Sequence, residues 1–474
     1  MTSDAAPTRL VVLGAGPGGY PAAFLAAEMG MDVTLVDTAE NPGGVCLYRG
    51  CIPSKTLLNV AHILETAESA DHFGITFEEP TVDLDRLRDW KDEVVKKMTG
   101  GLGQLSRARK VTYVQGRGRF TDANTLRVAN DSELTEVSFD YAVIATGSVP
   151  AIPGALRIES DRVWDSTAAL EIPEVPDRLL VVGGGYIGLE LGSVYAALGS
   201  EVTVVEMTGT LLPGADRDLV AILEKRIRER MHEILLHTTV AGLEEDGDVI
   251  RATLSGAETE SEVREFDRVL IAVGRRPNSA DLGIEDLGVV VNERGFIETD
   301  VQRRTGEPNI FAIGDVAGEP MLAHKATHEA RTAIEAIAGQ PSAFDPAAIP
   351  AVVFTDPEIA WTGLSETEAQ TRGIDIEISK FPWTASGRGT TIGRNDGVTK
   401  LILEPGTDRL LGVGIAGAGA GELIAEATLA VEMGARADDL RLTIHAHPTL
   451  SETVMEAAEV FFNTSPHYIG RRRT

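Results

Sequence analysis

Cys46 and Cys51 lie five positions apart in the stretch GGVCLYRGCIPSK (residues 43–55), and the 474-residue chain contains only these two cysteines. A disulfide that closes so short a loop stabilises a fold weakly, by roughly 2 kcal/mol against about 4.7 kcal/mol for a loop of a hundred residues. Five steps of a regular helix also advance about 7.5 Å, too far for easy bridging, so the chain between them must bend, which Gly50 permits. The pair therefore favours redox chemistry over a structural bridge.

The sequence after the second cysteine, IPSKTLLNVAHILETAES, has a helical pattern with Pro53 near its first turn. Cys51 would then lie at a helix N-terminus, where the helix dipole favours a thiolate, and Lys55 adds positive charge one turn later. Two buried, unreactive thiols are one alternative. Metal binding is another, less favoured because C-x₄-C has no second pair of ligands in the sequence, and we expect no metal site.

A candidate base lies near the C-terminus, in HAHPTLSE (residues 445–452). His447 precedes Pro448, which disfavours helix at the histidine and places it just before a helix. Glu452 follows five residues later and could accept a hydrogen bond from one imidazole nitrogen, which would fix the tautomer and raise the basicity of the other nitrogen. The alternative is a helix capped by Thr449 with two surface histidines. We expect His445 to be structural.

The elements that must position these groups include a nucleotide-binding unit at the N-terminus. RLVVLGAGPGG is a strand that ends in a turn with Gly14, Gly16 and Gly19, followed by a helical pattern and the strand DVTLVD, which ends at Asp37. Such glycines let backbone N–H groups approach a pyrophosphate, and the acid can bind ribose hydroxyls. An ordinary tight turn would explain the glycines but not the whole order of elements.

The same unit occurs a second time. RLLVVGGGYIG carries Gly183, Gly185 and Gly188 after a strand, and EVTVVE ends at Glu206, so that 23 positions separate the first glycine from the acid in both units. A carboxylate at residue 206 would hydrogen-bond a free 2′-hydroxyl and repel a 2′-phosphate, which favours NAD over NADP. Two dinucleotide sites in one chain suggest an electron relay between nicotinamide and a flavin.

Two further segments fit such a relay. ATGSVP (145–150) is a strand that runs into a turn and closes the first nucleotide domain, and NIFAIGDVAG (309–318) places Asp315 at the end of another strand. This acid could bind a ribityl hydroxyl of a flavin, although a plain strand-to-turn Gly-Asp would look the same.

The bulk composition excludes some functions. A net charge of −29 and a pI of about 4.7 argue against a nucleic-acid surface. Residues 10–27 carry no charge, but four glycines and two prolines interrupt them, so a signal peptide or membrane span is not expected. We expect a cytoplasmic protein that binds neither nucleic acid nor membrane.

Taken together, these motifs resemble the class I pyridine nucleotide–disulfide oxidoreductases, and among them the dihydrolipoyl dehydrogenase family, over essentially the whole chain. Further segments that look like that family are GRRPN (274–278), FAIGD (311–315), MLAHKA (321–326) and FPWTASGRG (381–389). The resemblance implies an α/β fold with two Rossmann-like dinucleotide-binding domains and an α+β C-terminal dimerisation domain. The expected division is an FAD domain (1–150), an NAD domain (151–279), a central domain that completes the FAD site (280–348) and an interface domain (349–474).

The family's roles carry over by position. Cys46 matches the thiol that exchanges with the substrate, Cys51 the thiol beside the flavin, and Lys55 the lysine near flavin N5. Glu190 matches the ion-pair partner of that lysine, and His447 with Glu452 matches the acid–base pair. The implied FAD contacts are Gly14, Gly16, Gly19, Asp37, Lys55, Gly118, Thr146, Gly147, Asp315 and Ala323. The implied NAD contacts are Gly183, Gly185, Gly188, Glu206, Val240 and Gly274.

The resemblance implies oxidation of protein-bound dihydrolipoamide to lipoamide with reduction of NAD⁺, through a redox-active disulfide and FAD. It also implies a homodimer in which His447 and Glu452 reach the other subunit. The implied partners are lipoyl domains and the core acyltransferase of 2-oxo acid dehydrogenase complexes, or the glycine cleavage system. Residues 59–110 are expected to form a solvated helical hairpin.

The sequence departs from the family's usual pattern at three positions. Tyr48-Arg49 replaces the usual Asn-Val between the cysteines, where Arg49 could lower a thiol pKa or reach solvent, and Asp37 replaces a Glu. Rival functions fit the sequence less well. Glutathione reductase prefers NADP, which Glu206 opposes, and mercuric reductase would have further cysteines near the C-terminus, where this chain has none. A soluble transhydrogenase would not need the cysteine pair, and a non-catalytic scaffold subunit would not need the full set of reactive residues.

Overall fold

The first parallel sheet is built around a buried, uncharged strand in the computed structural model, which describes residues 6–130, 133–256 and 261–470. Its order is β18-β7-β1-β2-β3, with every neighbouring pair parallel. The strands are β1 (Arg9–Leu13), β2 (Asp32–Asp37), β3 (Thr112–Gln115), β7 (Tyr141–Ile144) and β18 (Ile310–Ala312). Helices α1 (Gly19–Glu28) and α8 (Ala323–Ile337) pack against each other beside this sheet. Strands this apolar need cover on both faces.

A second parallel sheet repeats this design, in the order β12-β11-β10-β16-β9. Its strands are β9 (Val163–Trp164), β10 (Arg178–Val182), β11 (Glu201–Val205), β12 (Glu233–Leu235) and β16 (Arg268–Ile271). The two sheets differ in one edge strand, here called the fifth strand. In the first sheet it is β18, beside β7, which follows the other four strands in the chain; in the second sheet it is β9, beside β16, which precedes the other four. The expected fold class, with two Rossmann-like units, is confirmed.

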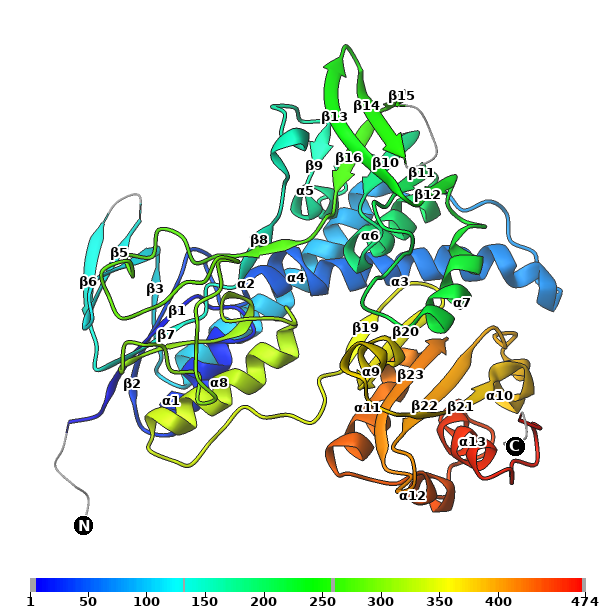
Figure 1. Cartoon of the computed structure of the whole chain (residues 1–474). Helices are drawn as coiled ribbons and strands as arrows, with labels where there is room; N and C mark the ends of the chain where they lie inside the picture. Colours follow the sequence, from blue (N-terminus) through cyan, green and yellow to red (C-terminus); the bar gives the residue numbers. More distant parts are fainter. Residues whose placement is uncertain (1–5, 131–132, 257–260, 471–474) are drawn as a thin grey trace.

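Each sheet carries an antiparallel three-stranded meander in one of its connections, between β3 and β7 in the first sheet and between β12 and β16 in the second. The meander strands are β4 (Arg117–Asp122), β5 (Thr125–Ala129) and β6 (Leu134–Ser138), then β13 (Thr238–Asp246), β14 (Val249–Gly256) and β15 (Glu262–Phe266). Strands β8 (Ser148–Pro150) and β17 (Arg275–Pro277) pair with each other where the chain passes between the two units (Figure 1).

The C-terminal part is an antiparallel sheet of order β19-β20-β23-β22-β21. Its elements are β19 (Ala351–Val353), β20 (Glu358–Gly363), α9 (Glu366–Arg372), β21 (Glu377–Pro382), α10 (Gly387–Thr391), β22 (Val398–Leu403), β23 (Leu410–Gly417), α11 (Ala420–Glu432), α12 (Ala437–Leu442) and α13 (Glu452–Phe461). Its buried core includes Phe381, Trp383 and residues of α11 and α13. An α+β C-terminal domain was expected here.

A buried ionic cluster joins the second unit to this sheet. Lys400 on β22 is fully buried, and its Nζ lies 2.6 Å from Asp216, 2.8 Å from Asp218 and 2.7 Å from Glu366. The two aspartates lie at the start of α7 (Arg217–Ile227). Since a buried charge is costly unless it is paired, the cluster holds the two lobes in one arrangement.

Two long helices, α3 (Cys51–Glu68) and α4 (Leu84–Ala108), fill the space between the three lobes (Figure 1). The short helix α2 (Gly44–Arg49) precedes α3, and α5 (Ser166–Leu170) and α6 (Tyr186–Ala197) lie beside them. The 3₁₀ turns are η1 (Ser69–Phe73), η2 (Gly154–Leu156), η3 (Gly314–Val316) and η4 (Trp383–Ala385). The expected helical hairpin at 59–110 is present as α3 and α4. It is not simply solvated, because α3 packs on α6 and Lys91 is buried.

The two glycine turns share the same close contacts. A Cβ at Gly19 would lie 1.7 Å from the Gly14 carbonyl oxygen, and a Cβ at Gly188 would lie 2.1 Å from the Gly183 carbonyl oxygen. In both units the third glycine therefore lets the helix touch the turn that precedes it.

Replacement of Gly188 by Ala should therefore lower the free energy of unfolding, by about 1–3 kcal/mol, because the methyl group has no room against backbone. Denaturant titration measures this loss. Gly185→Ala is the matched control, since a Cβ there meets nothing within 4 Å, and it should leave stability nearly unchanged. Equal stability of both variants would contradict the packing argument.

Candidate functional site

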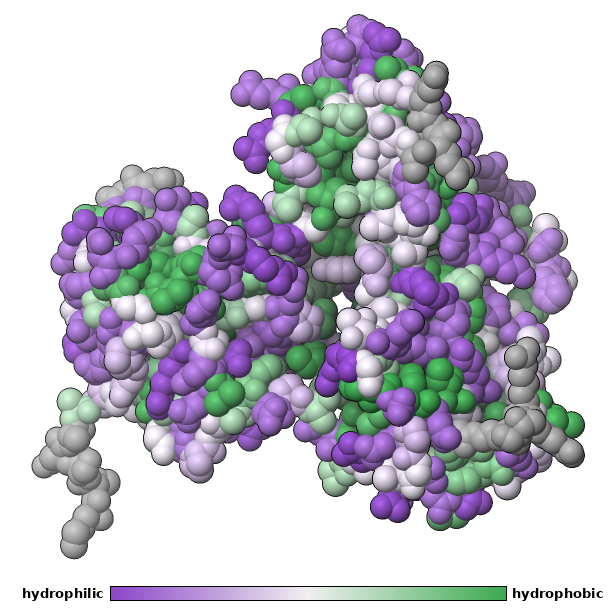
Figure 2. Space-filling view, viewed as in Figure 1, coloured by the Kyte–Doolittle hydropathy of each residue, from purple (hydrophilic) through white to green (hydrophobic). Residues whose placement is uncertain are grey.

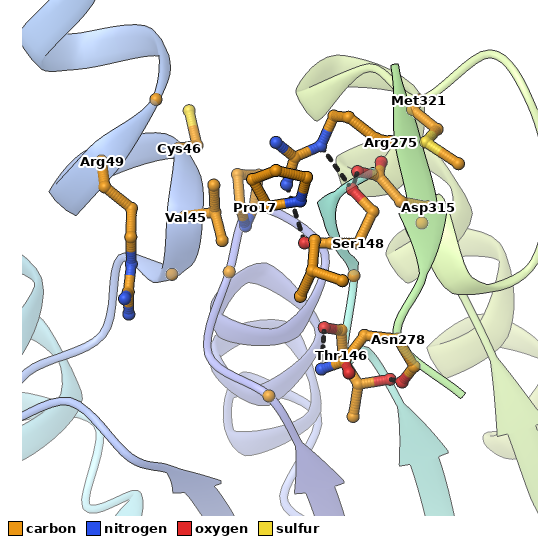
Figure 3. Close-up of a pocket in the computed structure, with 18 of the residues that line it drawn as sticks. Pro17, Val45, Cys46, Arg49, Thr146, Ser148, Arg275, Asn278, Asp315 and Met321 are labelled. Carbon is orange, nitrogen blue, oxygen red and sulfur yellow. Dashed lines mark hydrogen bonds between the residues drawn. The ribbon is translucent and has the colours of Figure 1, made fainter. Parts of the chain in front are cut away.

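One cavity of about 860 Å³ collects residues from the first sheet, the helices that carry the cysteines, and the β8–β17 junction (Figure 3). It lies at the C-terminal ends of β1 and β7, where ligands of doubly wound sheets bind. Its volume is at the upper end of ligand sites in proteins. Cys46 and Cys51 both line it, as do Gly14, Gly16 and Asp37.

The cysteines sit on two helices that are separated by one glycine. Helix α2 ends at Arg49 and α3 begins at Cys51. A Cβ at Gly50 would lie 2.9 Å from the Val45 carbonyl oxygen and 3.2 Å from the Cys46 Cα, so the bend needs a glycine. The expected bend and the place of Cys51 at a helix N-terminus are both observed.

The two thiols differ in acidity. The hydrogen bond from Cys46, together with the positive charge of Lys55, lowers the pKa of Cys51 to about 7. The same hydrogen bond, with burial, raises the pKa of Cys46. Near neutral pH the pair therefore holds a thiolate at Cys51 and a proton on Cys46, which makes the two sulfurs chemically distinct.

The two residues between the cysteines that depart from the family pattern, Tyr48 and Arg49, are not directed at the sulfurs. The Tyr48 hydroxyl donates to the Asn41 carbonyl at 3.0 Å and ties α2 to the preceding loop. Arg49 is exposed, and its side chain runs away from the Cys46 sulfur (Figure 3). Arg49 lines the mouth of the cavity from an exposed position. It is not among the causes of either thiol pKa shift, so of the two expected alternatives exposure to solvent is the one observed.

Lys55 is held by a buried carboxylate. Its Nζ lies 2.7 Å from Glu190 Oε2, and the Glu190 side chain is only 4% exposed. Glu190 Oε1 accepts the Phe354 N–H at 3.0 Å, and the Phe354 ring centroid lies 4.6 Å from Lys55 Nζ. Helix α3, helix α6 and the segment after β19 therefore meet at one carboxylate.

The far wall of the cavity is a hydrogen-bonded group that joins two expected FAD contacts, Thr146 and Asp315, to residues that sequence reasoning did not assign. Ser148 Oγ donates to Asp315 Oδ2 at 2.5 Å, and Arg275 Nε donates to Ser148 Oγ at 2.7 Å. Thr146 Oγ1 donates to the Asn278 carbonyl at 2.8 Å (Figure 3). The signal was present in the segments ATGSVP and GRRPN, which contain Ser148, Arg275 and Asn278 without a role having been given to them.

The acids that end β2 and β11 have a structural role beside the expected ribose contact. Asp37 Oδ2 accepts the Ala15 N–H at 2.6 Å, and Glu206 Oε2 accepts the Gly184 N–H at 2.8 Å. Glu206 Oε1 also accepts the N–H and hydroxyl of Thr208. Each acid therefore closes its own glycine turn.

The middle glycine of each turn tests the fit of a dinucleotide. A Cβ at Gly185 would meet nothing within 4 Å, and at Gly16 only the Gly44 Cα at 3.9 Å. This open space at a helix N-terminus lets a phosphate approach the backbone N–H groups. The residues present therefore fit FAD at the first turn and NAD at the second.

The other expected cofactor residues fall into two groups. The expected FAD residues line the cavity except Gly19, which packs beneath the turn; the lining members are Gly14, Gly16, Asp37, Lys55, Gly118, Thr146, Gly147, Asp315 and Ala323. None of the expected NAD residues lines it; these are Gly183, Gly185, Gly188, Glu206, Val240 and Gly274. The Val240 side chain is packed in the core of the second unit, so its predicted contact would have to come from its backbone.

The candidate base lies away from the cavity of its own chain. His447 Nδ1 is 2.9 Å from Glu452 Oε1, and the His447 side chain is 71% exposed. Glu452 is the first residue of α13, and its second oxygen accepts the Thr449 N–H at 2.8 Å. Nδ1–H donates to the carboxylate, which leaves Nε2 free as a base. Both nitrogens of His445 are engaged, with Thr443 and Glu426, as a structural role requires.

Comparison with known proteins agrees with this geometry. Residues 8–330 match the model of the pyridine nucleotide-disulphide oxidoreductases, and residues 349–458 match their dimerisation domain. The chain belongs to the pyridine nucleotide-disulphide oxidoreductase family. The sequence-based recognition is thus confirmed, with an oxidoreductase that uses FAD and NAD.

Several relatives are similar over nearly the full length. A dihydrolipoyl dehydrogenase of Vibrio cholerae is 48% identical over 96% of both chains, and one of Geobacillus stearothermophilus is 46% identical over 98% of both. Among solved structures, LpdA from Mycobacterium tuberculosis has a TM-score of 0.89 at 26% identity, covering 96% of this chain and 99% of its own. The flavoprotein disulfide reductase RclA from Escherichia coli, as a Cu(II) complex, has a TM-score of 0.86 at 28% identity, covering 96% and 100%. Among the described residues, no helix is both long and apolar enough to span a membrane.

The reduced protein should show a Cys51 thiol that alkylates with an apparent pKa near 7. Lys55→Met should raise this value, because the ammonium that favours the thiolate is lost. The measurement is the rate of iodoacetamide modification against pH, with the modified residue identified by mass spectrometry. Cys51→Ser is the control and should abolish the modification at residue 51 that has an apparent pKa near 7. A faster reaction at Cys46 than at Cys51 would contradict the assignment.

Proposed function

We propose that this chain oxidises protein-bound dihydrolipoamide to lipoamide and reduces NAD⁺ to NADH, through a Cys46–Cys51 disulfide and FAD. The activity is that of the dihydrolipoyl dehydrogenases, which are 42–49% identical to the chain over most of its length. The single observation that supports the residue assignment best is the asymmetric thiol pair in the wall of the first dinucleotide cavity.

In this reaction the four reactive residues, His447, Glu452, Cys46 and Cys51, each have a defined task. His447 Nε2 takes the proton from one thiol of the substrate, while Glu452 holds Nδ1–H. The substrate thiolate attacks the Cys46 sulfur, the Cys46–Cys51 bond breaks, and Cys51 leaves as a thiolate. The sulfur of the second substrate thiol displaces Cys46, which takes up that thiol's proton, and the cyclic disulfide is released. Bound FAD supplies the two-electron acceptor that links the dithiol to NAD⁺.

Lys55 and Glu190 act on the leaving thiolate. The Lys55 ammonium stabilises Cys51 as an anion, so that exchange at Cys46 has a good leaving group. Glu190 holds Lys55 from a buried position, which fixes the direction of the ammonium. Ser148 and Arg275 hold the Asp315 carboxylate toward the cavity, where it would bind a hydroxyl of FAD.

Two copies of the chain would complete the site. The match to the dimerisation domain supports a homodimer, and apolar areas lie exposed on the lobe that holds α11–α13 (Figure 2). Large apolar side chains exposed there are Leu429, Met433, Leu442 and Ile444. We infer that His447 and Glu452 of one subunit serve the cysteines of the other, since the base is exposed and outside the cavity of its own chain.

Further assignments are also proposals. The division into 1–150, 151–279, 280–348 and 349–474 is supported by the β8–β17 pairing, which places both passages between the nucleotide units side by side. We propose lipoyl domains and the core acyltransferase of a 2-oxo acid dehydrogenase complex, or the glycine cleavage system, as partners. We propose the cytoplasm as the location.

Steady-state rates should identify the substrate. Lipoamide, oxidised glutathione and mercuric ion are each supplied with NADH or NADPH. The largest kcat/KM is expected for lipoamide, and NADH should give a larger value than NADPH because Glu206 disfavours a 2′-phosphate. Lipoamide turnover below that of either rival would overturn the proposed function.

His447→Gln should slow lipoamide turnover by about 10²–10⁴-fold, because the thiol loses its general base. Reduction of ferricyanide by NADH should stay near the wild-type rate, since it bypasses dithiol exchange. His445→Gln is the matched control, as its imidazole makes structural contacts only, and it should retain dithiol exchange. Equal loss of both activities in His447→Gln would contradict the assigned role.

A further inference from the structure

A fully buried carboxylate on α8 has no role in the chemistry described above. Glu329 is 0% exposed, and its Oε1 lies 2.9 Å from Lys325 Nζ and 3.0 Å from Arg303 Nη1. Lys325 and Glu329 are one helical turn apart on α8, whereas Arg303 comes from the loop before β18 and stacks on Phe344 with 5.0 Å to the ring centroid. Such a cluster is retained only if its geometry is well satisfied.

This cluster binds both backbone polar groups of Gly314, in the turn after β18. Glu329 Oε2 accepts the Gly314 N–H at 2.6 Å, and Lys325 Nζ donates to the Gly314 carbonyl at 3.4 Å and to the Gly318 carbonyl at 3.0 Å. Gly314 has φ +76°, and a Cβ there would lie 3.1 Å from the Ala326 Cβ. The turn after β18 is therefore pressed against α8 and tied to it by two side chains of that helix.

The turn after β18 that is held in this way carries Asp315, and the helix that holds it, α8, begins at Ala323. Asp315 turns its carboxylate to Ser148 Oγ in the cavity wall, and Ala323 lines the same cavity. Glu329 and Lys325 thus set the position of one expected FAD contact relative to another, although neither is among the residues that line the cavity.

We propose that Glu329, with Lys325 and Arg303, is a positioning residue for FAD, which acts by fixing the Gly314–Asp315 turn against α8. This inference rests on the proposed assignment of Asp315 as an FAD contact. A carboxylate is needed because only an anion can bind two cations and a backbone N–H at once in a site closed to water. The expectation differs from that for a residue that only stabilises the fold: cofactor affinity should change more than stability.

The first test is Glu329→Gln in the full-length holoenzyme. We expect FAD affinity to fall at least tenfold in equilibrium dialysis against decreasing FAD, and the visible absorption band of the remaining bound flavin to shift. Glu335→Gln is the matched control, because Glu335 lies on the same helix and pairs with exposed Arg331; it should leave both readouts unchanged. A lower melting temperature with unchanged FAD affinity and an unshifted band would overturn the proposal.

A double-mutant cycle separates the inference from the assignment on which it rests. If Glu329 acts through the turn, the losses in FAD affinity of Glu329→Gln and Asp315→Asn should not multiply in the double variant. Those of Glu329→Gln and Asp37→Asn, at the other end of the cavity, should multiply. Full multiplication with Asp315→Asn would overturn the inference alone. An Asp315→Asn variant with unchanged FAD affinity would overturn the proposed contact and, with it, the inference.

Arg303→Gln serves if Glu329→Gln does not fold. This variant leaves the Lys325–Glu329 ion pair in place. The guanidinium that it removes lies at the rim of the cluster, since the Arg303 side chain is 14% exposed. We expect a smaller loss of FAD affinity, about threefold, that again fails to multiply with Asp315→Asn. Unchanged affinity in this folded variant would count against the cluster.

Discussion

The ion pair between Lys55 and Glu190 connects the three lobes of the molecule at the reactive thiols. Lys55 extends from the helix that begins at Cys51, Glu190 is buried in the second nucleotide unit, and the second oxygen of Glu190 accepts a backbone N–H from the C-terminal lobe. Because the carboxylate is almost fully buried, it must keep both partners. The ammonium that adds to the hydrogen bond from Cys46 in lowering the pKa of Cys51 is therefore correctly placed only when all three lobes are assembled.

The same logic recurs elsewhere in the fold, where charges are buried at contacts between units. Lys400 joins the second unit to the C-terminal sheet through three carboxylates, and Glu329 joins the turn after β18 to α8. Hydrophobic packing forms each lobe, but it is not directional. Buried ion pairs are stable only in a narrow range of distances and orientations. They therefore fix the positions of the thiol pair and of the two dinucleotide sites relative to one another, as electron transfer between them requires.

Local sequence was enough to predict the reactive elements. The spacing of Cys46 and Cys51 indicated a bend at Gly50, and the repeated glycine turns indicated two dinucleotide units, because these features depend on contacts within about twenty-five residues. The Glu329 cluster was not predictable in this way, since Arg303, Lys325 and Gly314 come together only after the sheet and α8 have packed. The hydrogen bonds of Asp37 and Glu206 to their own turns were also missed, because the same acid suits a ribose and a backbone N–H equally well.

The origin of the fifth strand has a consequence for biosynthesis. All five strands of the second sheet lie within residues 163–271, whereas the first sheet needs β18 at Ile310–Ala312. A ribosome releases the chain from its N-terminus, and domains fold as units while synthesis proceeds. The nucleotide unit that is second in the gene can thus finish its sheet first, and the nascent N-terminal strands must wait with an open edge until the later segment emerges.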